Sequence, residues 1–160
     1  MANYHQDRVG DIFIKACKCL NATPHQPCAK TAPGGAGFRI PLDKKGANFY
    51  QNGSTGFSFR VMNRQAPVNT ARNFKVAYTN LKTKIIAIDI FTPKKRQPKS
   101  INSILRIIAH EIAHHQKKPF KQLYSGHIIT RSHYPGFYKQ INKNIAKFKE
   151  DKELGQYFQI

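Results

Sequence analysis

Acidic residues are scarce in this sequence, which has eight Asp and Glu against 27 Lys and Arg and a net charge of +19 at pH 7. Between residues 12 and 149 the only acids are Asp43, Asp89 and Glu111. An excess of positive charge on this scale is typical of proteins that work beside a polyanion, so we expect a basic surface that contacts nucleic acid. The alternatives are an acidic substrate, or a cationic protein with no such partner.

Long apolar runs and secretion signals are also missing. No run approaches the roughly 18 consecutive apolar residues that span a bilayer, and the opening residues, MANYHQDRVG, do not join a basic segment to an apolar one. The three cysteines, an odd number confined to residues 17–28, cannot form a disulfide framework and suit a reducing compartment. We therefore expect a cytoplasmic protein that does not engage a membrane, with association with a nucleoid or nucleus as an alternative. We also expect a monomer.

The cysteines also raise the question of a structural metal site. Cys17, Cys19, His25 and Cys28 are four side chains of metal-ligand type within one short stretch. Structural zinc sites more often use ligand pairs separated by about two to four residues, and Cys17 and Cys19 would diverge on a helix. Buried or unpaired cysteines without metal are the favoured interpretation.

Length and patterning predict a single α+β domain over residues 1–160. Residues 1–36 are expected to hold an N-terminal helix, over residues 7–20, and a loop rich in Pro and Gly, whereas residues 37–160 are expected to form the main core of the domain. Alternating apolar residues predict a small, mostly antiparallel sheet with strands near residues 57–61, 74–78 and 86–90. Asn52-Gly53 predicts the tight turn of a hairpin in this sheet.

Two amphipathic helices are expected after the sheet. Ser100 is a candidate N-cap, and apolar residues at helical spacing from residue 101 to 112 predict a helix over about residues 100–116, ended by Pro119. A second helix is predicted over about residues 135–149, with Pro135 in its first turn and an apolar stripe of Phe137, Ile141, Ile145 and Phe148. The basic segment between the two helices is expected to be a loop.

The first of these helices contains an H-E-x-x-H motif, His110-Glu111-Ile112-Ala113-His114. Residues four apart lie on the same face of a helix, so His110 and His114 can present two imidazole nitrogens to one zinc ion. Glu111 lies beside them and can act as a general base toward water without binding the metal. The motif therefore predicts a Zn²⁺ cofactor and Glu111 as the catalytic residue. His115 points to another side of the helix and is expected behind the ligands or on the surface.

A catalytic zinc site needs a third protein ligand and an open fourth position. The extended metzincin motif is excluded, because Lys117 and Phe120 stand where its glycine and third histidine would be. His133 is the favoured third ligand, since it comes just before the second helix and four residues before apolar Phe137. The alternatives are His127, Glu150 and Glu153.

The segment SILRIIAHEIAHHQ, followed by SHYPGFYKQI, resembles the SprT-like and WLM-type minimal zinc metallopeptidases. In those families a short sheet precedes the HExxH helix, and a helix that opens with the third histidine follows it. The resemblance extends from TKIIAIDIF to NIAKF and implies a zincin-like fold. It also implies the roles of the matching residues: zinc ligands His110, His114 and His133, catalytic base Glu111 and packing residue Phe137. Tyr134 departs from the family, which usually has glycine there.

The resemblance implies hydrolysis of peptide bonds in protein or peptide substrates, and the positive charge adds proteins associated with DNA. In zincins the strand before the active-site helix pairs with an extended substrate, so TKIIAIDIF would be that edge. The residues with suitable chemistry to stabilise an oxyanion are Tyr124, His127, Tyr134 and Tyr138. The alternative function is a non-enzymatic, basic nucleic-acid-binding module with a structural or degenerate zinc site.

Overall fold

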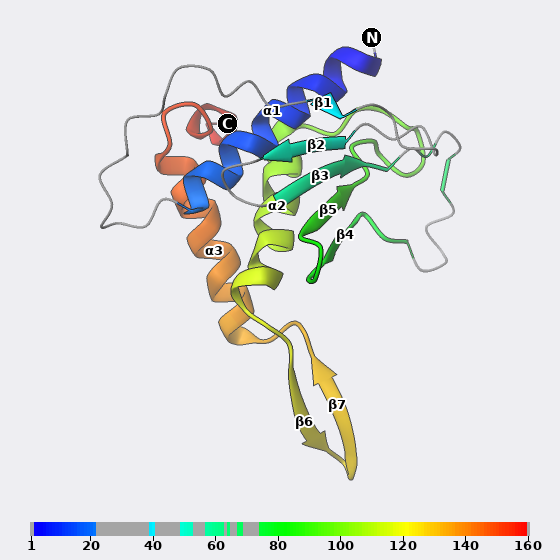
Figure 1. The fold of residues 1–160 in the computed structure, drawn as a ribbon, viewed down its shortest axis with the longest axis vertical. Helices are drawn as coiled ribbons and strands as arrows, with labels where there is room; N and C mark the ends of the chain where they lie inside the picture. Colours follow the sequence, from blue (N-terminus) through cyan, green and yellow to red (C-terminus); the bar gives the residue numbers. More distant parts are fainter. Residues whose placement is uncertain are drawn as a thin grey trace.

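A computed structural model describes residues 2–21, 39–40, 49–52, 57–62, 64, 67–68 and 74–159, with side chains placed for residues 7–20 and, from residue 57 on, for the described residues (Figure 1). Among these residues, no helix combines the length and hydropathy that crossing a membrane requires. The elements, in chain order, are α1 (Ala2–Asn21), β1 (Arg39–Ile40), β2 (Phe49–Asn52), β3 (Phe57–Val61), β4 (Ala77–Asn80), β5 (Ile85–Ile88), α2 (Ile101–Gln116), β6 (Phe120–Tyr124), β7 (His127–Arg131), α3 (Pro135–Glu150) and a final 3₁₀ turn, η1 (Gly155–Phe158).

The main sheet has five strands in the order β1-β2-β3-β5-β4. Its neighbouring strands are antiparallel except for the parallel pair β3 and β5, so the predicted α+β class and mostly antiparallel sheet are confirmed. Strands β2 and β3 form the predicted hairpin, with Asn52 opposite Phe57. The turn residues 53–56 lie outside the described part of the chain.

Strand β5 corrects one expectation about the substrate edge. It lies between β3 and β4, and every residue from Ile86 to Ile90 is buried. The segment TKIIAIDIF is therefore an interior strand, not the sheet edge that an extended substrate would join. The edge strand is β4, which begins later than predicted because residues 74–76 are not in the strand.

The three helices and the sheet share one apolar core. Helix α1 is longer than predicted, and its stripe of Val9, Ile12, Phe13, Ala16 and Leu20 is buried as expected. The ring of Phe13 stacks on Phe59 of β3, with centroids 4.8 Å apart. Figure 1 shows α2 between the sheet and α3, and α1 and α3 also pack on one another. Helix α2 thus has packing partners on several sides.

The boundaries of α2 and α3 agree with the sequence analysis. The Ser100 side chain accepts a hydrogen bond from the Ser103 N–H, which makes Ser100 the predicted N-cap of α2. Pro135 opens α3, where its fixed φ fits and no N–H is needed. The last turn of α2 ends at Gln116, before Pro119.

The connection from β5 to α2 is held by a buried carboxylate. Asp89 is fully buried, and its Oδ2 accepts a hydrogen bond from Arg96 Nη1 at 2.8 Å, while its Oδ1 accepts one from the Phe91 N–H at 3.1 Å. The ammonium of Lys99 donates to the backbone carbonyls of Asp89 and Phe91. These contacts fix the path by which the chain enters α2.

The segment between α2 and α3 is a hairpin, not the loop expected from the sequence. Strands β6 and β7 pair antiparallel through five residue pairs, from Phe120 opposite Arg131 to Tyr124 opposite His127. Ser125 and Gly126 form the turn with φ angles of 47° and 76°, the positive values that a two-residue hairpin turn requires. Figure 1 shows this hairpin projecting away from the rest of the protein.

Of the four residues proposed for a cysteine-based metal site, the structure describes two. Cys17 is buried in the core on α1, whereas the thiol of half-buried Cys19 donates to the Lys147 carbonyl oxygen at 3.5 Å. Burial raises the pKa of the Cys19 thiol. His25 and Cys28 lie outside the described residues.

Candidate metal centre

Three histidines meet at the junction of α2 and α3. His110 and His114 project from the same face of α2, as their spacing predicts, and His133 comes two residues before α3 begins. One ring nitrogen from each lies within 4.8 Å of the other two. The ring centroids form a nearly equilateral triangle with sides of 5.0, 5.1 and 5.0 Å. The structure therefore brings together the three residues that the sequence analysis selected as ligands.

The separation of the ring nitrogens suits a tetrahedral metal ion. The Nε2 atoms of His133 and His110 are 3.2 Å apart. A tetrahedron drawn around zinc with Zn–N bonds of about 2.0–2.1 Å has edges of roughly 3.3 Å. Imidazole nitrogens are also the ligands most often used for zinc in catalytic sites. The donor set therefore fits this metal, and the His110–His133 pair already has the spacing of two ligands in a tetrahedral site.

Phe137 supports all three imidazole rings. Its side chain is fully buried in the first turn of α3, and its ring centroid lies 5.1, 4.6 and 4.9 Å from those of His110, His114 and His133. The ring therefore fills the space behind the cluster. It limits the rotamers of the three histidines and keeps their nitrogens facing one another.

The surroundings favour neutral imidazoles. Burial, together with the neighbouring histidines, lowers the pKa of His114 to about 4, and burial and His133 lower that of His110. A metal ion binds the neutral form of histidine, so these ligands need to release no proton at neutral pH.

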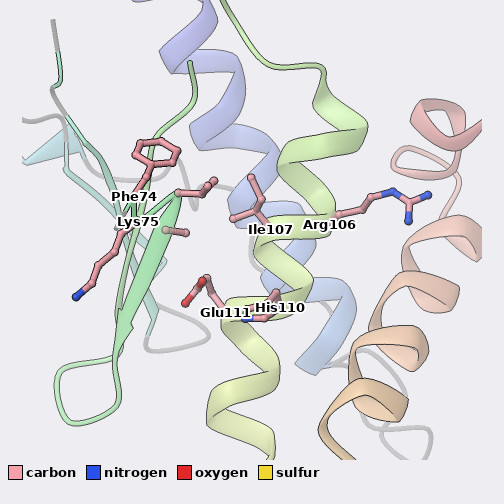
Figure 2. Close-up of a pocket in the computed structure, with 8 residues that line it drawn as sticks. Phe74, Lys75, Arg106, Ile107, His110 and Glu111 are labelled. Carbon is pink, nitrogen blue, oxygen red and sulfur yellow. The ribbon is translucent and has the colours of Figure 1, made fainter. Parts of the chain in front are cut away.

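Glu111 is buried beside the histidines. Its side chain is only 6% exposed, and burial raises its pKa to about 7. Its carboxylate is not one of the atoms that gather within 4.8 Å. Figure 2 shows the carboxylate extending from α2 toward the segment that carries Phe74 and Lys75. Glu111 is thus placed beside the histidine cluster, with a pKa suited to exchanging a proton near neutral pH.

A cleft runs between α2 and the edge strand β4. It consists of two adjoining hollows of about 510 and about 330 Å³, and Lys75, Ala77, His110 and Glu111 line both. The larger hollow has apolar walls from Phe74, Val76 and Ile107, and Figure 2 shows the guanidinium of Arg106 turned away from it. The smaller hollow also reaches His114 and His133, so the histidine cluster opens into the cleft.

Three hydrogen bonds, made by two side chains, hold α2 in place around the cluster. His115 Nε2 lies 2.5 Å from Thr79 Oγ1, which links the end of α2 to the edge strand β4. The buried side chain of Asn144 on α3 donates to the Ala109 carbonyl at 3.1 Å and to Gln116 Oε1 at 2.8 Å. His115 therefore lies outside the histidine cluster and contacts β4. Sequence analysis did not single out Asn144.

The structure places the other candidate residues elsewhere. His127 lies at the turn end of the hairpin, opposite Tyr124. Glu150 ends α3 and is exposed, and Glu153 pairs with Lys15 of α1. None of these three belongs to the histidine cluster.

The tyrosines suggested for oxyanion binding have different surroundings. Tyr124 lies under the Arg131 guanidinium on the hairpin, and the Tyr134 hydroxyl donates to the Lys118 carbonyl at 3.4 Å. Tyr138 is exposed, and its ring stacks on His133 with centroids 6.4 Å apart. Tyr138 is therefore the tyrosine of the three whose ring contacts a member of the cluster.

Comparison of the chain with protein-family models, with curated proteins and with solved structures finds no match.

Proposed function

We propose that this protein is a zinc-dependent metallopeptidase of SprT-like type, with His110, His114 and His133 as zinc ligands and Glu111 as general base. The observation that carries the proposal is the meeting of three imidazoles and a buried carboxyl group at one cleft. The sequence resemblance to SprT-like and WLM-type peptidases rests on the same residues. A zincin-like arrangement of the fold is part of this proposal.

The number of ligands favours a catalytic site over a structural one. Structural zinc sites usually have four protein ligands, whereas catalytic sites have three and keep one position open. Within the described part of the chain, the cluster holds three histidines and no fourth ligand. His115, the nearest further histidine in sequence, is bonded to Thr79. The open side of the cluster faces the cleft.

A zinc ion bound there would polarise the scissile carbonyl and make a water molecule a better nucleophile at neutral pH. Glu111 would accept the proton of that water and pass it to the nitrogen of the leaving amine. The edge of β4 would pair with the extended substrate, since β4 lines the cleft and its outer side carries no neighbouring strand among the described residues.

The charge of the protein supports nucleic acid as a further partner. No acidic residue lies between residues 112 and 149, a stretch that holds β6, β7 and almost all of α3. A surface of this kind would retain the protein on DNA and bring DNA-associated proteins to the cleft as substrates. Binding would weaken steeply with added salt, because it depends on release of counterions.

The first experiment is zinc stoichiometry by elemental mass spectrometry on the purified, reduced protein and on His133→Ala. We expect one zinc per chain, lost or much weakened in the variant. Near-zero zinc after reconstitution would contradict the metal site. Zinc fully retained by His133→Ala would move the third ligand to another residue.

The second experiment tests catalysis with Glu111→Gln. This change keeps the size of the side chain and removes the base, so zinc content and folding should be unchanged while casein hydrolysis is lost. Hydrolysis that persists in Glu111→Gln would reject the peptidase mechanism. In that case a basic nucleic-acid-binding module with a structural zinc site would be the better description. Added DNA should raise the rate of casein cleavage, and an unchanged rate across DNA and salt titrations would remove DNA from the proposal.

A further inference from the structure

The β6–β7 hairpin carries apolar side chains that nothing in the described structure covers. Leu123 and Ile128 face one another across the hairpin next to its turn, and their side chains are 70% and 73% exposed. Among the described helices and strands, β6 and β7 make their extensive contacts with each other and with no other element. Adjacent aliphatic side chains this exposed on a projecting element mark an interaction surface.

The two faces of the hairpin differ. On one face the aromatic rings are already engaged, because Phe120 packs edge-to-face on Tyr134 at 5.0 Å and Arg131 lies over Tyr124 at 5.8 Å. On the other face Leu123 and Ile128 lie beside the cross-strand pair of Lys121 and Thr130. The more exposed apolar side is therefore the aliphatic one, since Leu123 and Ile128 are 70% and 73% exposed against 44% and 58% for Phe120 and Tyr124. Unpaired bases are bound chiefly by stacking on aromatic rings, so this side fits apolar side chains of a polypeptide better than nucleic acid.

Both ends of the hairpin reach the cleft. Pro119, just before β6, and Ser132, just after β7, line the same hollow as the histidine cluster. A polypeptide that lies along the hairpin can therefore continue into the cleft. The hairpin and its flanks carry basic side chains without an acid, namely Lys117, Lys118, Lys121 and Arg131. A partner of matching charge has acidic residues near its apolar ones.

We propose that the β6–β7 hairpin is a docking element for the protein substrate, in which Leu123 and Ile128 bind an aliphatic segment of an unfolded, acidic polypeptide while a neighbouring stretch of the same chain occupies the cleft. This inference rests on the proposed peptidase function.

The length of the hairpin sets the length of substrate that benefits. Each strand has five residues, which at about 3.4 Å per residue puts the tip roughly 15 Å from the base. An extended substrate needs about five residues to cover that distance. Peptides that fill only the cleft therefore gain nothing from the hairpin, whereas longer peptides do.

The test compares two peptides built around a cleavage site that mass spectrometry identifies in casein. The short peptide spans the cleft alone, and the long peptide adds about ten native residues on each side. The variant is Leu123→Ser with Ile128→Ser, and the control is Gln122→Ser, an exposed residue of β6 on the opposite face. We expect the double variant to raise KM for the long peptide at least about tenfold with kcat unchanged. The double variant should cleave the short peptide as the unmodified protein does. The control Gln122→Ser should cleave both peptides as the unmodified protein does.

Equal losses on both peptides would overturn the proposal, because they would show that the hairpin supports the cleft itself. The proposal would also be overturned if the double variant and the unmodified protein cleaved the long peptide at equal rates. If the zinc-loaded protein cleaves neither peptide, the peptidase proposal fails, and docking is then judged by fluorescence anisotropy with labelled casein. Casein affinity that falls at least tenfold in the double variant supports docking, whereas unchanged affinity rejects it. A double variant that loses affinity for a single-stranded oligonucleotide or for phosphatidylserine vesicles, and not for casein, would show that polypeptide is the wrong partner.

Discussion

Removal of the Asp89 carboxylate is expected to destabilise the protein strongly. Asp89 is fully buried, and its partners are Arg96, at 2.8 Å, and the N–H of Phe91, with Arg64 at 3.9 Å from the same oxygen as Arg96. Asp89→Asn keeps the size of the side chain and an oxygen for the Phe91 N–H. The variant thus isolates the loss of the charge opposite Arg96.

The magnitude follows from the burial of the pair. Leaving one member of a buried ion pair without its partner costs about 3–5 kcal/mol. The Arg96 side chain is 12% exposed, so water can solvate part of its charge and the lower end, about 3 kcal/mol, is expected. Domains of this size are stable by about 5–15 kcal/mol, so the variant should fold but unfold at clearly lower denaturant.

The assay is urea unfolding followed by far-ultraviolet circular dichroism, since the protein contains no tryptophan. Unfolding of Asp89→Asn, Arg96→Gln and the double variant completes a double-mutant cycle. Arg96 also donates to the Arg64 carbonyl, but that loss is present with or without Asp89 and cancels in the cycle. We expect a coupling of about 2 kcal/mol between Asp89 and Arg96. A coupling below about 0.5 kcal/mol would refute the argument that the pair holds the entry to α2.

Phe137→Leu should lower zinc affinity by about 10–100-fold in a competition titration with a chelator, because the three imidazoles lose their shared support; an unchanged affinity would show that the ring only fills space. Ser100→Ala should reduce the free energy of unfolding by about 1 kcal/mol, since the Ser103 N–H loses its acceptor, and Ser100→Asp should restore it. In the metal-free protein, His114 has a pKa of about 4 against an ordinary 6.5, so the unfolded chain takes up a proton that the folded one does not. The free energy of unfolding should therefore fall as the pH drops through this window, and less so in His114→Gln; equal pH dependence of the two proteins would contradict this.

The candidate site was predictable because it depends on short-range geometry. The spacing of His110 and His114 on a capped amphipathic helix places both on one face whatever the rest of the fold does. His133 required an inference about packing, and its position just before the buried Phe137 supplied it. Asn144 was not predictable, since its role depends on the register between α2 and α3, which no local pattern encodes.

The wrong predictions concern β5 and the β6–β7 hairpin, in which burial does not alternate between an apolar and a polar face. Strand β5 was predicted with one apolar face, but Ala87 between its isoleucines is buried too, which is typical of a central strand. The hairpin was missed for the opposite reason, because Leu123 and Ile128 are exposed and its two faces mix apolar with polar residues. The Ser125-Gly126 pair was the available signal, since both positions take the positive φ of a tight turn.

The two buried acids of the described structure make the strongest argument for a functional site. Asp89 is buried against Arg96 and accepts a backbone hydrogen bond, which is how a fold stabilises a buried charge. Glu111 is nearly as buried, yet no described residue bonds to its carboxylate, and burial alone accounts for its raised pKa. A buried carboxyl group with no partner among the described residues costs stability, and this one faces a cleft beside three histidines. Buried ionisable groups without a hydrogen-bond partner occur mostly at functional sites, and among the described residues Glu111 is such a group.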